Sequence, residues 1–218
     1  MTGTLLVGVG AGLGRALAIA FAAGCAPVTL VARRRAAVAA IADELRASGV
    51  AAEGRTADVR DEAALRAAIG AVVEQFGAPD VLVYNAAIIQ RDGVGDLDAE
   101  QHEHAWGVNV GGALTAVAAL APLMTRRGSG TVLLTGGMPT PDPDYVSLSL
   151  GKAGLRALTE LLAARYGPAG VHVATVTVGG EIAAGTALDP DSIAAHYVRL
   201  HHQPPAGWER EILLPAPG

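Results

Sequence analysis

Residues 4–15 read TLLVGVGAGLGR, an apolar run that leads directly into closely spaced glycines. Thr4–Val9 predicts a strand and the stretch from Leu13 to Ala23 predicts a helix. Glycine permits a sharp turn, lets a pyrophosphate approach the backbone, and lets a helix pack closely on a strand. The N-terminus of the helix would offer free N–H groups to the phosphates. We interpret the stretch as a nucleotide-binding loop, with a plain tight turn as the alternative; its expected cofactor contacts are Gly8, Gly10, Gly12, Leu13 and Gly14.

The rest of the chain repeats this alternation of strand and helix. Further strands are expected at Val28–Ala32, Ala51–Thr56, Val81–Tyr84, Thr131–Leu134, His172–Val178 and Glu211–Leu214. Further helices are expected at Arg35–Ser48, Asp61–Phe76, Ala99–Met124, Tyr145–Tyr166 and Asp189–His202. Seven strands alternating with six helices predict an α/β, Rossmann-type doubly wound fold, a seven-stranded parallel sheet with helices on both faces. We expect a single domain, residues 1–218, with a nucleotide-binding half to about residue 98 and an active-site half over 99–218.

Composition excludes several classes of function. The net charge of −5 gives no reason to expect a nucleic-acid partner. The longest uncharged run, Ala16 to Ala32, is interrupted by Gly24 and Pro27 and is shorter than the roughly 20 residues of a membrane span. A single cysteine, no signal peptide and no Cys or His pattern for a metal predict a soluble, cytoplasmic protein without a metal site or membrane partner.

The end of the second expected strand bears on the choice of dinucleotide. An acidic residue there would bind the adenosine ribose hydroxyls, but the chain reads Ala32-Arg33-Arg34. An arginine can instead form charge-assisted hydrogen bonds to a 2′-phosphate. We therefore favour NADP(H) over NAD(H), with Arg33 and Arg34 as contacts; a solvated arginine cluster is the alternative.

Four motifs occur in an order that resembles the short-chain dehydrogenase/reductase family over Thr4 to about Val178. They are Gly8–Gly14, Asp58-Val59, Asn85-Ala86-Ala87 and Asn109. The resemblance implies that the glycines line the pyrophosphate and that Asp58 and Val59 meet the adenine, although Asp58 alone also suits a turn cap. It places Asn85 and Ala86 at the ribose and its loop, and Asn109 in a proton relay. It also implies a homodimer or homotetramer formed through the fourth and fifth helices.

The family's usual catalytic signature, Tyr-x-x-x-Lys, is incomplete, because the chain has Leu148 four residues before Lys152. Gly136 and Gly137 stand where the family usually has serines. Leucine cannot donate a proton, and a positioned acid contributes about 10²–10⁴ in rate. Lys152 is still expected to reach the nicotinamide ribose. The proton would come from Tyr145, from Thr135, or from a water held by Lys152 and Asn109.

The substrate end also departs from the family pattern. Gly179-Gly180-Glu181-Ile182 replaces the usual Pro-Gly after the sixth strand, and Gly180 and Ile182 are expected to contact the cofactor. Ile88, Met138 and Leu148 are expected to line a cleft suited to an apolar small-molecule substrate. The sequence thus predicts an oxidoreductase acting on a carbonyl, alcohol or imine. The alternatives are a non-redox nucleotide-binding regulator, and a cyclase or isomerase on the same fold.

Overall fold

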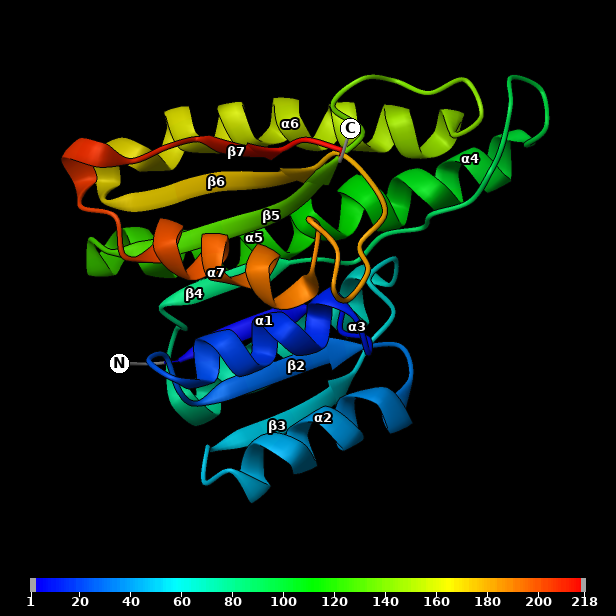
Figure 1. Ribbon diagram of the computed structural model, residues 1–218. Coiled ribbons are helices and arrows are strands. Elements are labelled where there is room, and N and C mark those ends of the chain that lie inside the picture. The colour runs from blue at the N-terminus through cyan, green and yellow to red at the C-terminus, as the bar shows by residue number, and fades with distance from the viewer. Residues whose placement is uncertain (1–2, 217–218) are drawn as a thin grey trace.

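The computed structural model describes residues 3–216, which form one parallel sheet with helices on both faces (Figure 1). The strands lie in the order β3-β2-β1-β4-β5-β6-β7. Their bounds are β1 Thr4–Val7, β2 Val28–Ala32, β3 Ala52–Thr56, β4 Val81–Tyr84, β5 Gly130–Gly137, β6 Val171–Val178 and β7 Glu211–Leu214. The order reverses between β1 and β4, and ligands of such sheets bind at that point, beyond the carboxyl ends of the strands.

Two apolar cores hold the helices to the sheet. One lies beneath α1 (Leu13–Ala22), α2 (Arg35–Ala47) and α7 (Pro190–His201), which stand in front of the sheet in Figure 1. The other lies beneath α3 (Glu62–Phe76), α5 (Gly112–Arg127) and α6 (Val146–Tyr166). Because both faces are covered, the inner strands are apolar on both sides, and every residue of β1, β4 and β6 is buried. The predicted fold is confirmed.

The helix predicted over Ala99–Met124 is interrupted. It consists of α4 (Ala99–Trp106), a π-helical segment at Gly107–Gly111 and α5, which ends at the left-handed Gly128. The expectation of one uninterrupted helix was therefore wrong, and the π-helical segment sets the position of Asn109. The combined helix is long and apolar enough to span a membrane, but 56% of its most apolar window is buried inside the fold.

Two strand ends also differ from expectation, and glycine explains both. β1 ends at Val7 rather than Val9, because Gly8 takes a positive φ of 94° and turns the chain. β5 continues past Leu134 to Gly137. A Cβ at Gly136 would stand 2.4 Å from the Thr177 hydroxyl, so glycine is what allows β5 to stay paired with β6 there.

Candidate active site

The glycines after β1 have different structural roles. A Cβ on Gly8 would stand 2.1 Å from the Ala86 nitrogen, and one on Gly14 would stand 2.9 Å from the Val9 α-carbon. Gly8 and Gly14 are thus required by close packing. A Cβ on Gly10 or Gly12 would meet nothing within 4 Å. These two positions keep an open surface above the turn.

That open surface lies at the N-terminus of α1. Gly12 caps the helix without any side-chain hydrogen bond, and the first turn contains no acidic residue. The end of the helix therefore keeps N–H groups and partial positive charge for an anion. On the other side, Asn85 donates from Nδ2 to the Gly8 carbonyl oxygen at 2.7 Å and fixes the turn to the loop after β4. These features fit a dinucleotide pyrophosphate.

The charged residues after β2 and β3 fit the adenosine end of such a ligand. Arg33 and Arg34 are exposed, and within residues 3–216 neither guanidinium forms a hydrogen bond or ion pair. Asp58 accepts hydrogen bonds from the Arg60 backbone and from its guanidinium. Partial burial opposes ionisation, but these bonds hold the pKa of Asp58 below its usual value. The arginines are thus available to an anionic group, while Asp58 stays charged.

Lys152 lies on α6, one turn after Leu148, and both side chains are 5% exposed. Its Nζ donates a hydrogen bond to the Thr135 carbonyl oxygen at 2.7 Å. Burial disfavours the ammonium form and lowers the pKa of Lys152 to about 8. A Cβ on Gly137 would stand 3.5 Å from the lysine Cε, so the end of β5 offers backbone beside this amine and no hydroxyl.

The Thr135 hydroxyl does not face Lys152. Thr135 donates from Oγ1 to Asn85 Oδ1 at 2.9 Å and shares a 2.7 Å hydrogen bond with the Tyr197 hydroxyl of α7. It is therefore turned toward the face of the sheet that α1 and α7 cover, whereas α6 lies on the other face. The hypothesis that Thr135 supplies the proton fails on this geometry, because the extension of β5 fixes which way the side chain points.

Tyr145 stands at the outer start of α6, where it is the N-cap residue. Its ring lies beside the Arg91 guanidinium, whose Cζ is 5.8 Å from the ring centroid, and its backbone pairs with that of Asp92. These contacts account for the half-buried ring at the helix entry. A role for Tyr145 as proton donor stays a prediction.

Asn109 is fully buried and its side chain is occupied. Its Oδ1 accepts from the Ile88 backbone N–H at 2.8 Å, and its Nδ2 donates to the Ile88 carbonyl at 3.4 Å. A Cβ on Gly151 of α6 would stand 2.7 Å from the Asn109 Cβ. The side chain thus positions the loop after β4 against α6, so any relay at this point would use the Asn109 backbone.

Two further residues shape the site and were not predicted from the sequence. Arg156 donates from Nη1 to the carbonyl oxygens of Gly137 at 2.8 Å and Met138 at 3.1 Å, and Met138 has a positive φ of 48°. The sequence does contain one indication of this role for Arg156: it lies four residues after Lys152, which places both side chains on one face of α6.

The second is Asp92, a carboxylate that is 3% exposed. Its Oδ1 accepts from the Ser147 backbone N–H at 2.9 Å, and its carbonyl accepts from the Val146 N–H at 3.1 Å. Burial opposes ionisation, but hydrogen bonds from Ser147, Gln90 and Val146 hold the pKa of Asp92 below its usual value. Asp92 thus caps α6 from another loop, and an acid outside the helix gives no capping pattern in the sequence.

The expected substrate and lid residues lie on the loops beyond the strand ends. Ile88 and Met138 are half-buried, at the ends of β4 and β5. Gly180 follows β6, where a Cβ would stand 3.0 Å from Leu188 Cδ1, and Ile182 packs partly against the core beneath α7. Figure 1 shows this lid at the edge toward which the strand arrowheads point. Their contacts with cofactor or substrate stay predictions.

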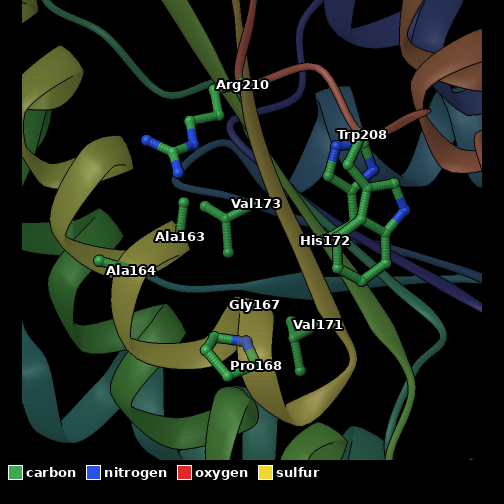
Figure 2. Close-up of a pocket in the computed structure, with 9 residues that line it drawn as sticks. All are labelled: Ala163, Ala164, Gly167, Pro168, Val171, His172, Val173, Trp208 and Arg210. Carbon is green, nitrogen blue, oxygen red and sulfur yellow. The ribbon is translucent and has the colours of Figure 1, made fainter. Parts of the chain in front are cut away.

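A separate cavity of about 410 Å³ lies near the amino ends of the strands, between the end of α6 and the starts of β6 and β7 (Figure 2). Its walls are mainly apolar, and the Trp208 and His172 rings stack at 4.9 Å along one side. Val171 begins β6, whereas the Lys152 region meets the end of β5. The cavity is therefore distinct from the candidate active site. Within residues 3–216, no group of His, Cys, Asp and Glu side chains forms a metal site.

Comparison with known proteins gives consistent matches. The family model described as short chain dehydrogenase matches residues 3–188. The chain is 30% identical over 229 residues to sepiapterin reductase from Chlorobaculum tepidum, with 96% of this chain and 94% of that protein covered. A metagenomic short-chain oxidoreductase in complex with NADP is 25% identical, with a TM-score of 0.90 over 99% of this chain and 98% of that chain. An NAD⁺-bound xylitol dehydrogenase is 26% identical, with a TM-score of 0.76 over 82% and 70%.

Proposed function

Because the chain belongs to the short-chain dehydrogenase family, we propose that it is an NADP(H)-dependent oxidoreductase with a proton donor other than tyrosine at position 148. Its substrate would be a carbonyl compound or imine, or the corresponding alcohol or amine. The observation that supports this best is the combination of an open glycine turn at the start of α1 with a buried lysine of α6 whose amine contacts the end of β5. Together they would provide a place for a dinucleotide and a proton-bearing group near its reactive end.

Each part of the site would have a separate role in binding the cofactor or in the reaction. Gly10 and Gly12 would leave room for the pyrophosphate, and the N–H groups of α1 would bind it. Bound NADP(H) would supply or accept the hydride. Lys152 would hold the nicotinamide ribose and provide positive charge near the oxygen that becomes an alkoxide.

The preference for NADP(H) rests on Arg33, whose guanidinium forms no hydrogen bond or ion pair within residues 3–216. An exposed guanidinium can form a bidentate pair with the negatively charged 2′-phosphate, and no acidic residue at the end of β2 competes for the guanidinium. Similar proteins have been solved with either NADP or NAD⁺. The overall similarity therefore does not favour either dinucleotide, whereas Arg33 favours NADP(H).

A second candidate function is favoured by Leu148. Its apolar side chain is buried where an acid would be needed, so the protein would bind the nucleotide and regulate a partner without turnover. A chemistry other than redox, such as a cyclase or isomerase, would share the fold but not consume NADPH.

One experiment separates these functions. NADPH binding is measured by the change in nicotinamide fluorescence, and NADPH oxidation is then followed with a panel of aldehydes, diketones and cyclic imines. The oxidoreductase predicts both binding and oxidation with at least one panel member. Binding with no oxidation would favour the regulator, and no binding would contradict both.

We also propose that the protein is a homodimer or homotetramer. Trp106, Leu114, Leu150 and Leu161 are large apolar residues of α4, α5 and α6 with 47–69% of their surface exposed. A second copy of the same helices would cover them. Light scattering coupled to size-exclusion chromatography tests this, and a monomer at micromolar concentration would contradict it.

A further inference from the structure

We propose that Lys152 is itself the proton donor of the reaction, with its ammonium delivering the proton that the tyrosine of other family members would deliver. The inference rests on the proposed oxidoreductase function. It assigns to one named residue the role left open by Leu148.

The first observation is compositional. Lys152 is the only lysine of the chain, and all other residues in the Lys+Arg total of 16 are arginines. Arginine stays protonated at any physiological pH and cannot serve as an acid that loses its proton. The chain thus has arginine at every other basic position of the Lys+Arg set and has its single lysine at this buried position.

The second observation is that position 148, the end of β5 and the Asn109 side chain offer no free proton donor beside the lysine amine. Leu148 has no polar atom, and Gly136 and Gly137 have no side chain. The Thr135 hydroxyl is bonded to Asn85 and Tyr197 on the other face of the sheet. The Asn109 amide is bonded to the Ile88 backbone.

The third observation is the environment of the amine. An ammonium has three N–H donors, and within residues 3–216 Lys152 uses one, toward the Thr135 carbonyl oxygen. The facing segments 107–111 and 130–137 contain no titratable residue, and His172 lies at the far start of β6. Arg156, the next charged residue on this helix face, is bonded to two carbonyl oxygens. With no carboxylate to stabilise the charge, burial brings the pKa of Lys152 to about 8, near the pH at which a general acid works best.

The proton balance of the step is simple. As hydride adds to the carbonyl carbon, the carbonyl oxygen gains an electron pair and takes a proton from Nζ, so that an O–H bond forms and an N–H bond breaks. Lys152 is left as a neutral amine and recovers its proton from solvent. The net reaction consumes one carbonyl group, one NADPH and one proton, and gives an alcohol and NADP⁺.

The first test follows the amine directly, without turnover. Protein grown with ¹³Cε-labelled lysine has a single lysine signal, whose chemical shift is titrated in the absence of nucleotide. We expect a midpoint near pH 8. Arg165→Lys places a second lysine at an exposed position of the same helix, and its signal should titrate near the ordinary value of about 10.4. A midpoint for Lys152 as high as that of the control would overturn the proposal.

The second test separates donation from binding. Lys152→Arg keeps the positive charge but cannot release a proton, so NADPH affinity should change less than about tenfold while kcat falls by roughly 10²–10⁴. Adding methylamine to Lys152→Ala should restore part of the lost rate. The Arg165→Lys protein should keep wild-type kcat.

The outcomes distinguish a failure of the donor role of Lys152 from a failure of the proposed oxidoreductase function. If turnover survives Lys152→Arg, the donor role is overturned and the oxidoreductase function is left intact. The same holds if turnover disappears in Tyr145→Phe while Lys152→Arg stays active. NADPH binding without turnover of any panel compound would count against the donor role and favour the non-redox regulator. Wild-type protein that does not bind NADPH would overturn both.

Discussion

The α-carbon of Gly8 faces Ala86 so closely that a methyl group on it would stand 2.1 Å from the Ala86 nitrogen. Gly8 directly follows β1 and Ala86 lies in the loop after β4, and the sheet order reverses between these two neighbouring strands. The contact packs the turn after β1 against the loop after β4 at the candidate dinucleotide site, whereas a Cβ on Gly12 would meet only open space. Glycine is thus needed for packing at one position and for ligand access at the other.

Substitutions at these two glycines should therefore have different effects. Gly8→Ala introduces the clash and forces alanine into a φ of 94°, so we expect a loss of about 2–4 kcal/mol in the free energy of unfolding. Gly12→Ala should change stability by less than about 1 kcal/mol, because its methyl group meets no protein atom. It should raise the Kd for NADPH at least tenfold by filling the space of the phosphates. Urea denaturation and fluorescence titration check the two effects, and a Gly12→Ala protein with unchanged affinity would contradict the site.

The order of the elements could be predicted because each is encoded locally. The Thr4–Val7 strand, the glycine turn and the α1 helix follow one another in the sequence. Asp61, at the start of the expected third helix, caps α3 by accepting a hydrogen bond from the Ala64 N–H. The π-helical segment at Gly107–Gly111 was missed because five residues of altered winding hardly disturb the apolar periodicity of a long helix.

The parts of the site that were missed depend on tertiary contacts. Thr135 is a candidate donor in the sequence because it carries a hydroxyl near the end of the fifth strand, but the direction of its side chain depends on how far β5 stays paired with β6. Asp92 caps a helix that begins more than 50 residues later. Neither relationship leaves a pattern in one sequence.

Arg33→Ala should weaken NADPH far more than NADH. Charged hydrogen bonds to a phosphate contribute about 1.5–3 kcal/mol, so the Kd for NADPH should rise roughly 10- to 100-fold while that for NADH changes little. Exposed Arg165, at the far end of α6, provides the matched control Arg165→Ala. Equal weakening of both dinucleotides would contradict the assignment of Arg33 to the 2′-phosphate.

Asp92→Asn should loosen the start of α6. The neutral amide oxygen is a weaker acceptor for the Ser147 N–H than the carboxylate, and we expect a loss of about 1–3 kcal/mol at pH 7. Because the pKa of Asp92 is lower in the folded protein than in the unfolded chain, its contribution is complete above about pH 4 and is lost as pH falls through the folded pKa. Urea denaturation at pH 7 and at pH 3 checks the sign, since the difference between the two proteins should shrink in acid. A difference that grows in acid would contradict the capping role.

Leu148→Tyr would place a phenol one turn before Lys152 on α6. If the rest of the site is arranged for hydride transfer, kcat should rise by about 10- to 100-fold, within the range that a positioned acid contributes. Leu148→Phe is the matched control, because it has nearly the same size without the hydroxyl. A gain shared by the phenylalanine variant would point to packing, and no gain in the tyrosine variant would show that the phenol is misplaced.

Lys152→Met should stabilise the fold while it abolishes turnover. At pH 7 the wild-type protein keeps an ammonium in a site whose burial lowers its pKa to about 8, against about 10.4 in the unfolded chain. That difference corresponds to a penalty on the order of 3 kcal/mol, from which the lost hydrogen bond to the Thr135 carbonyl subtracts about 1 kcal/mol. We therefore expect Lys152→Met to be more stable by about 1–2 kcal/mol at pH 7.

Between pH 8 and about pH 10.4 the folded state binds fewer protons than the unfolded state. Wild-type stability therefore rises with pH relative to the variant, and the difference in stability between the two proteins shrinks. Urea denaturation at pH 7, 8.5 and 10 measures this, with Arg165→Met as the exposed control. A variant less stable than wild type at pH 7 would show that the lysine is held for its contribution to the fold, whereas the expected gain would show that this buried charge is kept for chemistry.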